Sequence, residues 1–175
     1  MVATLKKPSL SKKSRSKYHQ GIYTPRHPEK YLGSSGNIIY RSKWELMFLR
    51  WADETPAVLR YSSEECVIPY ISPIDGKYHK YYIDFFISVL QTNGMIKNFL
   101  VEVKPYSQTI PPVLKKKRIT ESYQEALRTY AVNQAKWEAA RSVCQKRGWD
   151  FIIITEKQLF RKQKDGPKKK SKNIA

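Results

Sequence analysis

The sequence predicts a single α/β domain in which helices flank a mixed central sheet. Three observations favour this fold class: an amphipathic helical segment, four extended segments in close succession, and a second helical region that leads into a short apolar strand. With 175 residues, of which 41% are hydrophobic, the chain can form one core but hardly two separate domains.

The first predicted helix begins after Ser42. Ser42 and Glu45 have the spacing of a capping box, in which the serine side chain binds a free amide of the first helical turn. Apolar residues then recur at intervals of three and four, which is typical of one face of a helix. The members of this expected face are Trp44, Met47, Phe48 and Trp51.

Four extended segments follow, at residues 58–62, 64–71, 80–90 and 98–104. Residues 73–76 (PIDG) predict a turn before the third segment, and Asn93-Gly94 predicts a hairpin before the fourth. Strands joined by short turns are usually antiparallel neighbours, so we expect a β-meander.

A Pro- and Lys-rich loop at residues 105–119 separates the meander from the second helical region. Ser122 and Glu125 predict a helix start, Asn133 is expected to cap a further helix, and Gly148 to end it. The inner face of that helix should carry Trp137, Ala140 and Cys144. The apolar run at residues 150–155 predicts a strand that is buried on both faces.

The formal net charge of +18 predicts a polyanionic partner. Residues 1–30 carry a net charge of +7 and residues 161–175 a net charge of +6, which together make 13 of the 18 charges. We therefore expect a flexible basic arm at residues 1–35, a folded domain at 36–161 and a flexible basic tail at 162–175. Such arms either grip phosphates or are solvated tails without a specific role.

The composition also bears on location. No apolar run is long enough to cross a bilayer, and the N-terminal segment lacks the apolar region of a secretory signal. Cys66 and Cys144 stand far apart and suggest neither a disulfide framework nor a metal cluster. We expect a protein that is not secreted, has no membrane partner and works in a reducing compartment.

Strand alternation brings three chemically useful side chains together. Glu102 and Lys104 project from one face of the fourth segment, with Leu100, while Phe99, Val101 and Val103 occupy the other face. The adjacent hairpin strand brings Asp84 within reach of them. In that strand, we expect Tyr82, Asp84 and Phe86 on one face and Ile83, Phe85 and Ile87 on the other.

Acidic residues within apolar sequence are costly to bury, and a divalent cation between Asp84 and Glu102 would relieve that cost. Mg²⁺ prefers a few carboxylate oxygens together with water and phosphate, and the carbonyl of Val103 could complete its shell, with Mn²⁺ as a substitute. Lys104 would orient the attacking water or counter the developing negative charge. The alternative is a structural salt bridge between Lys104 and either acid.

Further residues are candidates for nucleic-acid contact. The strongest is the basic run that follows the catalytic strand: Lys115, Lys116, Lys117 and Arg118. Gln108 lies in the same loop and could touch substrate, or it could simply be polar loop sequence. Lys136 lies on a helix that could pass near the site, with a solvated lysine as the alternative.

The chain resembles the PD-(D/E)XK nuclease superfamily in six short stretches. They are SKWELMF (42–48), VIPY (67–70), YYIDF (81–85), LVEVKP (100–105), NQAKWEAA (133–140) and GWDFIIITE (148–156). Within it, the chain is most similar to the branch of Tn7-type transposase endonuclease subunits and head-completion nucleases of T-even-like phages. The resemblance implies a restriction-endonuclease-like core and Mg²⁺-dependent hydrolysis of DNA phosphodiester bonds.

By that resemblance, Asp84 and Glu102 bind the metal, Lys104 assists the water, and Glu45 is the helix acid of the catalytic set. Ile83 departs from the pattern, since it precedes Asp84 where the family name has a proline. The capping role of Glu45 stays open as a second explanation for that residue.

The function that the resemblance implies is that of a phage head-completion nuclease acting on packaged double-stranded DNA or its ends. Portal or neck proteins would be its partners, and the virion or host cytoplasm its location. The alternatives are a transposase-type endonuclease subunit, a Holliday-junction resolvase acting as a homodimer, and a non-catalytic DNA-binding virion protein. The oligomeric state is open.

Overall fold

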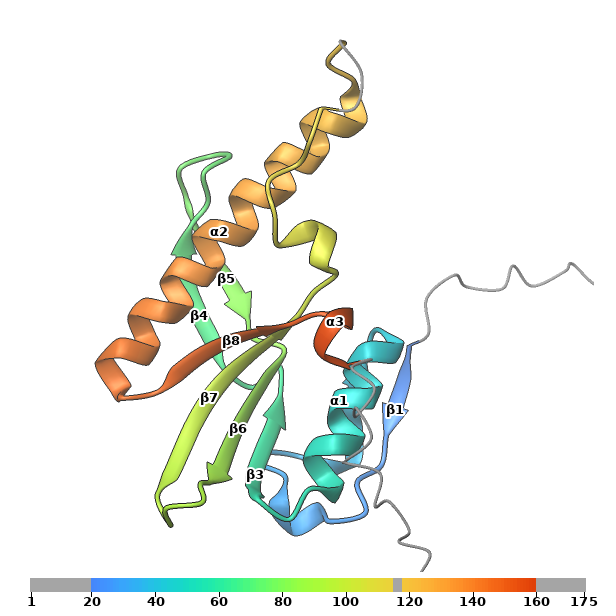
Figure 1. Ribbon diagram of the computed structural model, residues 1–175, viewed down its shortest axis with the longest axis vertical. Helices are drawn as coiled ribbons and strands as arrows, with labels where there is room; N and C mark the ends of the chain where they lie inside the picture. The colour runs from blue at the N-terminus through green and yellow to red at the C-terminus, as the bar shows by residue number, and fades with distance from the viewer. Residues whose placement is uncertain (1–19, 115–117, 160–175) are drawn as a thin grey trace, which may run out of the picture.

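A computed structural model of the chain describes residues 20–114 and 118–159 (Figure 1). At its centre is a four-stranded mixed sheet with the order β3-β6-β7-β8. β3 pairs with β6 and β6 with β7 in antiparallel fashion, whereas β7 and β8 are parallel. The strands are β3 (Val58–Ser63), β6 (Phe85–Leu90), β7 (Ile96–Val103) and β8 (Asp150–Ile154). The predicted α/β class with a mixed central sheet is confirmed.

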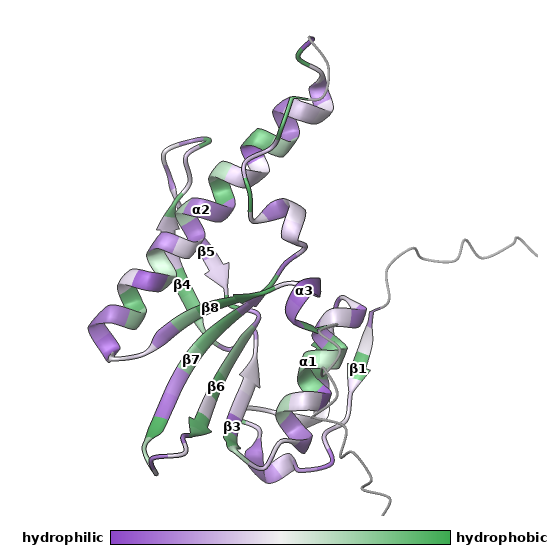
Figure 2. Ribbon diagram, in the orientation of Figure 1, coloured by the Kyte–Doolittle hydropathy of each residue, from purple (hydrophilic) through white to green (hydrophobic). Residues whose placement is uncertain are grey.

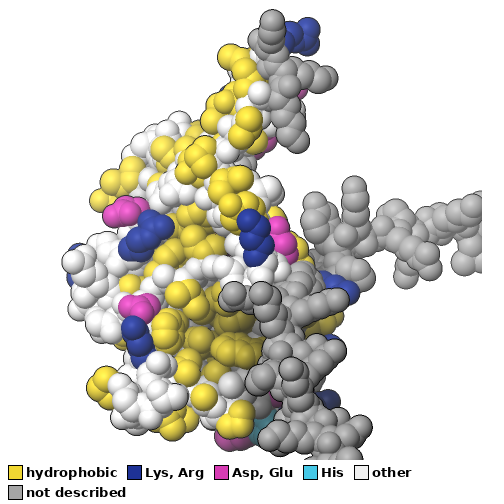
Figure 3. All heavy atoms as spheres, viewed as in Figure 1, with side chains coloured by type: hydrophobic (Ala, Val, Ile, Leu, Met, Phe, Trp, Pro, Cys, Tyr) yellow, Lys and Arg dark blue, Asp and Glu magenta, His cyan; other side chains and the backbone are white. Residues whose placement is uncertain are grey.

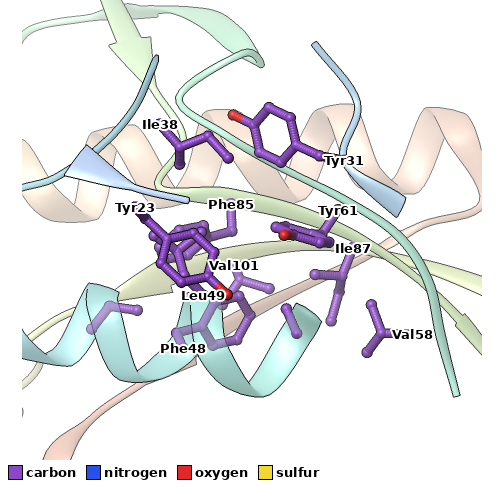
Figure 4. Packing of buried hydrophobic residues seen from close by; sticks show 12 residues of the cluster. Tyr23, Tyr31, Ile38, Phe48, Leu49, Val58, Tyr61, Phe85, Ile87 and Val101 are labelled. Carbon is purple, nitrogen blue, oxygen red and sulfur yellow. The ribbon is translucent and has the colours of Figure 1, made fainter. Parts of the chain in front are cut away.

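Helix α1 (Lys43–Glu54) packs on one face of this sheet, next to the short α3 (Glu156–Leu159). The Oγ of Ser42 accepts a hydrogen bond from the amide of Glu45 at 3.1 Å, as the capping pattern predicts. Phe48 stacks on Phe85 of the sheet, with 4.5 Å between ring centroids (Figure 4). The expected apolar face is only partly right, because Trp51 is 47% exposed and the helix buries Leu49, Ala52 and Asp53 instead.

Helix α2 (Glu121–Arg147) packs on the opposite face and extends well beyond the sheet (Figure 1). The expected inner face of Trp137, Ala140 and Cys144 is buried. The predicted helix boundaries are wrong in two places. The N-cap is Thr120, not Ser122, and the helix runs without interruption through Asn133, which is buried. No glycine or proline interrupts residues 121–147, so nothing local ends the helix there.

The expected strand at residues 80–90 is two strands in two different sheets. β5 (Tyr78–Tyr82) pairs with β4 (Val67–Ile71) in a separate antiparallel hairpin, while β6 belongs to the central sheet. The chain changes direction at Ile83-Asp84, so Ile83 packs in the α2 cluster and Phe85 in the α1 cluster. The predicted alternation therefore fails at this point. The predicted meander is likewise wrong at β3, whose neighbour is β6 rather than β4.

Residues 20–35, expected in the N-terminal arm, are instead part of the folded core. β1 (Gly21–Tyr23) pairs with β2 (Ile38–Tyr40), and two 3-10 turns, η1 (Pro28–Lys30) and η2 (Ser35–Asn37), lie between them. Tyr31 packs against the ring of Tyr61. The rest of the expected arms, residues 1–19 and 162–175, lies outside the described residues.

Much of β6, β7 and β8 is hydrophobic, whereas hydrophilic residues are spread along α2 (Figure 2). In the same view, hydrophobic side chains gather over the sheet between the two long helices (Figure 3). Among the described residues, no helix combines the length and apolar character that a membrane crossing requires.

Candidate active site

Glu102 lies near the end of β7, on the face that α2 covers, and only 2% of its surface is exposed. Its Oε2 accepts a hydrogen bond from the hydroxyl of Tyr81 at 2.6 Å. Its Oε1 lies 2.8 Å from the Nζ of Lys104. Both oxygens of this buried carboxylate are therefore partnered, as burial of a charged group requires.

Asp84 occupies the corner between β5 and β6. Its Oδ2 accepts a hydrogen bond from the amide of Val103 at 2.7 Å, which holds the carboxyl group beside β7. Burial, followed by the negative charge of Glu102, raises the pKa of Asp84 to about 8, although Lys104 and the Val103 amide act in the opposite direction. Two carboxyl groups are thus held close enough to disfavour joint ionisation.

Lys104 keeps its charge in this setting. Burial alone would lower its pKa, but the carboxylates of Glu102 and Asp84 outweigh that effect and raise it. The side chain is 28% exposed, so the ammonium group faces both the acids and the solvent. The structure thus brings Asp84, Glu102 and Lys104 together at one end of the central sheet.

Lys136 on α2 also reaches this region. Its Nζ lies 5.5 Å from the ring centroid of Tyr81 and 5.7 Å from that of Tyr70. Burial and the charge of Lys104 lower the pKa of Lys136. A second ammonium group therefore stands near the acidic pair, on the helix where the sequence suggested it.

Glu45 takes part in the cap of α1 and also acts electrostatically on the acidic site. Its amide is capped by Ser42, and its Oε2 accepts a hydrogen bond from the amide of Arg41 at 2.7 Å, which accounts for it as a helix-capping residue. Its negative charge also acts on Asp84 and on Lys104. The capping role therefore does not remove Glu45 from the site.

The other predicted contact residues follow β7 in the chain. Gln108 is exposed at the end of the turn η3 (Tyr106–Gln108), which follows β7. Arg118 is exposed ahead of α2, and the helix rise puts it roughly 25 Å from Lys136 along the helix. Lys115, Lys116 and Lys117 lie outside the described residues. Arg118, the described member of the basic run, therefore lies away from the acidic pair.

Two features of the site escaped sequence reasoning. The alternation of the third segment drew attention to Tyr82, whereas Tyr81 is the residue that contacts Glu102. The ion pair between Arg41 and Glu64, beside Asp84, carried no local signal because the two residues are 23 positions apart.

The profile of the family described as "TnsA-like endonuclease N terminal" matches residues 55–156, which is more than half of the chain. The chain belongs to this family. The TnsA-like match contains Asp84, Glu102 and Lys104, and it begins after Glu45.

A curated protein, the head completion nuclease of Enterobacteria phage T4, is 36% identical over 149 residues, a span that covers 81% of this chain and 93% of the phage protein. No solved structure matches the chain significantly. Membership in the TnsA-like endonuclease family and this relative together support a nuclease.

Proposed function

We propose that the protein is a Mg²⁺-dependent endonuclease that hydrolyses phosphodiester bonds of double-stranded DNA, with Glu45, Asp84, Glu102 and Lys104 in its active site. The observation that carries the proposal is the close pairing of Asp84 and Glu102 with the ammonium of Lys104, in a chain of an endonuclease family. Perturbed carboxyl groups next to a lysine are typical of active sites.

The donor set fits a hard divalent cation. No group of three or more His, Cys, Asp or Glu side chains in residues 20–114 and 118–159 forms a metal cluster. Mg²⁺ needs only one or two carboxylates, because water and substrate phosphate complete its octahedron. Asp84 and Glu102 would supply those carboxylates, and a positive charge between them would lower the pKa of Asp84 again.

Val103 would supply the backbone ligand. Its amide faces Asp84, with 2.7 Å from nitrogen to Oδ2. In an extended strand, the N–H and C=O groups of one residue point to the same side, so the carbonyl of Val103 faces the same side. Mn²⁺ fits the same oxygen donors.

The residues of the site would have different roles in hydrolysis. When bound, the cation supplies positive charge to the phosphate oxygens and lowers the pKa of a water nucleophile. Lys104, held at 2.8 Å by Glu102 and partly open to solvent, would orient that water and counter the charge that builds on the phosphate. Glu45, whose charge acts on both Asp84 and Lys104, would add a further negative charge to the site.

DNA would be held by positive charge around this centre. Lys136 stands beside the site, and Gln108 follows the active strand, so both would contact the strand being cut. Lys115, Lys116, Lys117 and Arg118 would contact phosphates farther along the duplex. These contacts would make binding salt-sensitive and largely independent of sequence.

Within this activity, the extensive similarity to a phage head completion nuclease supports a role in head completion. The substrate would then be packaged DNA or its ends, the partners portal or neck proteins, and the location the virion or host cytoplasm.

The test is cleavage of plasmid and linear DNA by the purified protein in Mg²⁺, Mn²⁺ or EDTA. Asp84→Asn and Lys104→Ala should each slow cleavage by about 100-fold or more. Lys97→Ala is the matched control, because Lys97 lies on the same strand and forms an exposed ion pair with Asp150. Cleavage that persists in EDTA, or at full rate in both site variants, would refute the assignment. DNA binding without cleavage in any metal would leave either the structural, non-catalytic alternative or a subunit that needs a partner to cut.

The family match favours a second candidate, an endonuclease subunit of a transposase. Such a subunit would cut only in the presence of its partner transposase. Mg²⁺-dependent cleavage by the isolated protein would contradict this second candidate and leave the first in place.

A further inference from the structure

Arg41 and Glu64 form a bidentate ion pair beside the acidic pair. Nε and Nη2 of Arg41 each donate to a different carboxylate oxygen of Glu64, both at 2.8 Å. The arginine side chain is 60% exposed. Exposed ion pairs typically stabilise a protein by about 1 kcal/mol or less, so a contribution to stability does not by itself account for this bidentate pair.

Glu64 adopts an unusual backbone conformation. Its φ of +57° makes it the one residue other than glycine, in the part of the chain that the structure describes, with a positive φ. In this conformation its amide donates to the carbonyl of Asp84 at 3.2 Å. A left-handed conformation costs a residue with a side chain about 1 to 3 kcal/mol, and such strain persists where the surroundings enforce it, often at functional sites.

The same arginine also contacts the acid of α1. The backbone amide of Arg41 donates to Oε2 of Glu45 at 2.7 Å. Three contacts therefore link Glu45 to Asp84: the Arg41 backbone to the Glu45 carboxylate, the Arg41 side chain to the Glu64 carboxylate, and the Glu64 backbone to the Asp84 carbonyl. Glu45 and Asp84 belong to different elements, and these contacts tie the two together.

We propose that Arg41 and Glu64 are positioning residues that fix the Glu45 carboxylate relative to Asp84. The inference rests on the proposed nuclease function and extends it to two residues that contact neither metal nor phosphate. A guanidinium group gripping both oxygens of a carboxylate fixes direction as well as distance, which a lysine ammonium cannot do. Small misplacements of catalytic groups reduce rates strongly, so the pair should affect turnover more than binding.

Steady-state kinetics of Arg41→Gln, Glu64→Gln and the double variant test this assignment. Each single variant should lower kcat by about 10- to 100-fold with little change in KM. The double variant should be no slower than the slower single variant, because the two residues act as a unit. Arg41→Lys should recover only part of the rate. The matched controls are Arg26→Gln and Glu54→Gln, an exposed Arg–Glu pair at the other end of α1 with 2.9 Å between Nη1 and Oε1, which should leave kcat unchanged.

A second measurement separates this inference from the proposed function. Mn²⁺ binding to the DNA-free protein, followed by calorimetry, should weaken several-fold in Arg41→Gln and in Glu64→Gln but not in the control variants. If wild-type protein does not cleave DNA, the proposed function fails, and unchanged Mn²⁺ affinity in both variants would overturn the positioning role as well.

Kinetic outcomes can also overturn it. A raised KM in Arg41→Gln together with a normal KM and kcat in Glu64→Gln would mean that Arg41 binds a DNA phosphate directly. An equal fall of kcat in the control pair would mean that any disturbance of α1 slows the enzyme.

Discussion

The hydroxyl of Tyr81 donates to Oε2 of Glu102 at 2.6 Å, although the two residues belong to different sheets. Both are almost completely buried. Burial and the charge of Glu102 raise the pKa of Tyr81, so the phenol stays protonated and remains a donor. Through this bond the β4–β5 hairpin supports a side chain of the central sheet.

Removing that hydroxyl should destabilise the protein. Tyr81→Phe leaves one oxygen of a buried carboxylate without its partner, so the free energy of unfolding should fall by about 1 to 3 kcal/mol. Urea denaturation measures the change. Tyr82→Phe is the control, because Tyr82 is 51% exposed and its substitution should change stability by no more than about 0.5 kcal/mol. Equal effects of the two substitutions would contradict the structural role of Tyr81.

The raised pKa of Asp84 predicts a pH-dependent stability of the metal-free protein. Its pKa of about 8 in the folded state lies well above that of an unfolded aspartate, about 3.9, so the folded state binds the proton more tightly. Stability from this group is therefore complete below about pH 4 and is lost as the pH rises towards about 8.

Asp84→Asn should lack that loss, and in EDTA its stability relative to wild type should rise with pH by up to about 1.4 kcal/mol per pH unit. Denaturation curves in EDTA at several pH values measure the difference. Mg²⁺ should reduce the pH dependence of the wild type, because a bound cation competes with the proton. Parallel pH profiles for the two metal-free proteins would argue against the raised pKa.

Asp53 is the anchor of the N-terminal segment. Its carboxylate accepts hydrogen bonds from the hydroxyls of Tyr23 and Tyr61 and from the amides of Arg26 and His27, at distances of 2.7 to 3.1 Å. Burial alone would raise its pKa, but these donors lower it below the ordinary value. The stability that Asp53 provides is therefore present above about pH 4 and is lost as the pH falls further.

Asp53→Asn replaces one of the two carboxylate oxygens by an NH₂ group, so two of these four donors lose their acceptor. The free energy of unfolding should fall by roughly 3 kcal/mol or more. Amides in residues 21–31 should then exchange hydrogen faster, as mass spectrometry can detect. Glu54→Gln, at the next position and exposed, should have little effect on either measurement. Unchanged exchange in Asp53→Asn would mean that another contact holds the segment.

Deletion of residues 1–19 would leave β1 and all later elements in the chain. Residues 1–19 contain six Lys and Arg residues and no acid, so deleting them should weaken DNA binding and reduce the salt slope of log K by up to about 5. Deletion of residues 1–30 should instead destabilise the domain, because it removes Tyr23 and Lys30. Lys30 donates to the carbonyls of Ala52, Asp53 and Thr55 at 2.6 to 3.0 Å. An unchanged salt slope after the shorter deletion would exclude this arm from phosphate contact.

Local patterns predicted much of the framework. The Ser42 cap, the faces of β7 and the presence of strand β8 follow from helical and strand periodicity, which depends on neighbours a few residues away. The expected burial of β8 on both faces is wrong, because β8 is the edge strand of the sheet and is only partly buried. The placement of Glu102 and Lys104 on one face belongs to this group, because residues two apart in a strand point the same way.

Other features depend on tertiary structure. The segment at residues 80–90 is apolar on both sides of Asp84, so its sequence does not reveal that β5 and β6 enter different sheets, and that division is what turns Tyr81 towards Glu102.

The sequence by itself determined which residue types could form a metal site and that Glu102 and Lys104 share one face at the end of β7. Only the tertiary structure decided that Arg41 reaches Glu64, that Asp53 holds residues 20–31 to the core, and that Lys136 lies over Tyr81, the partner of Glu102. These contacts join residues far apart in the chain, and their distances are set by how the helices and the hairpin pack on the sheet rather than by any local periodicity.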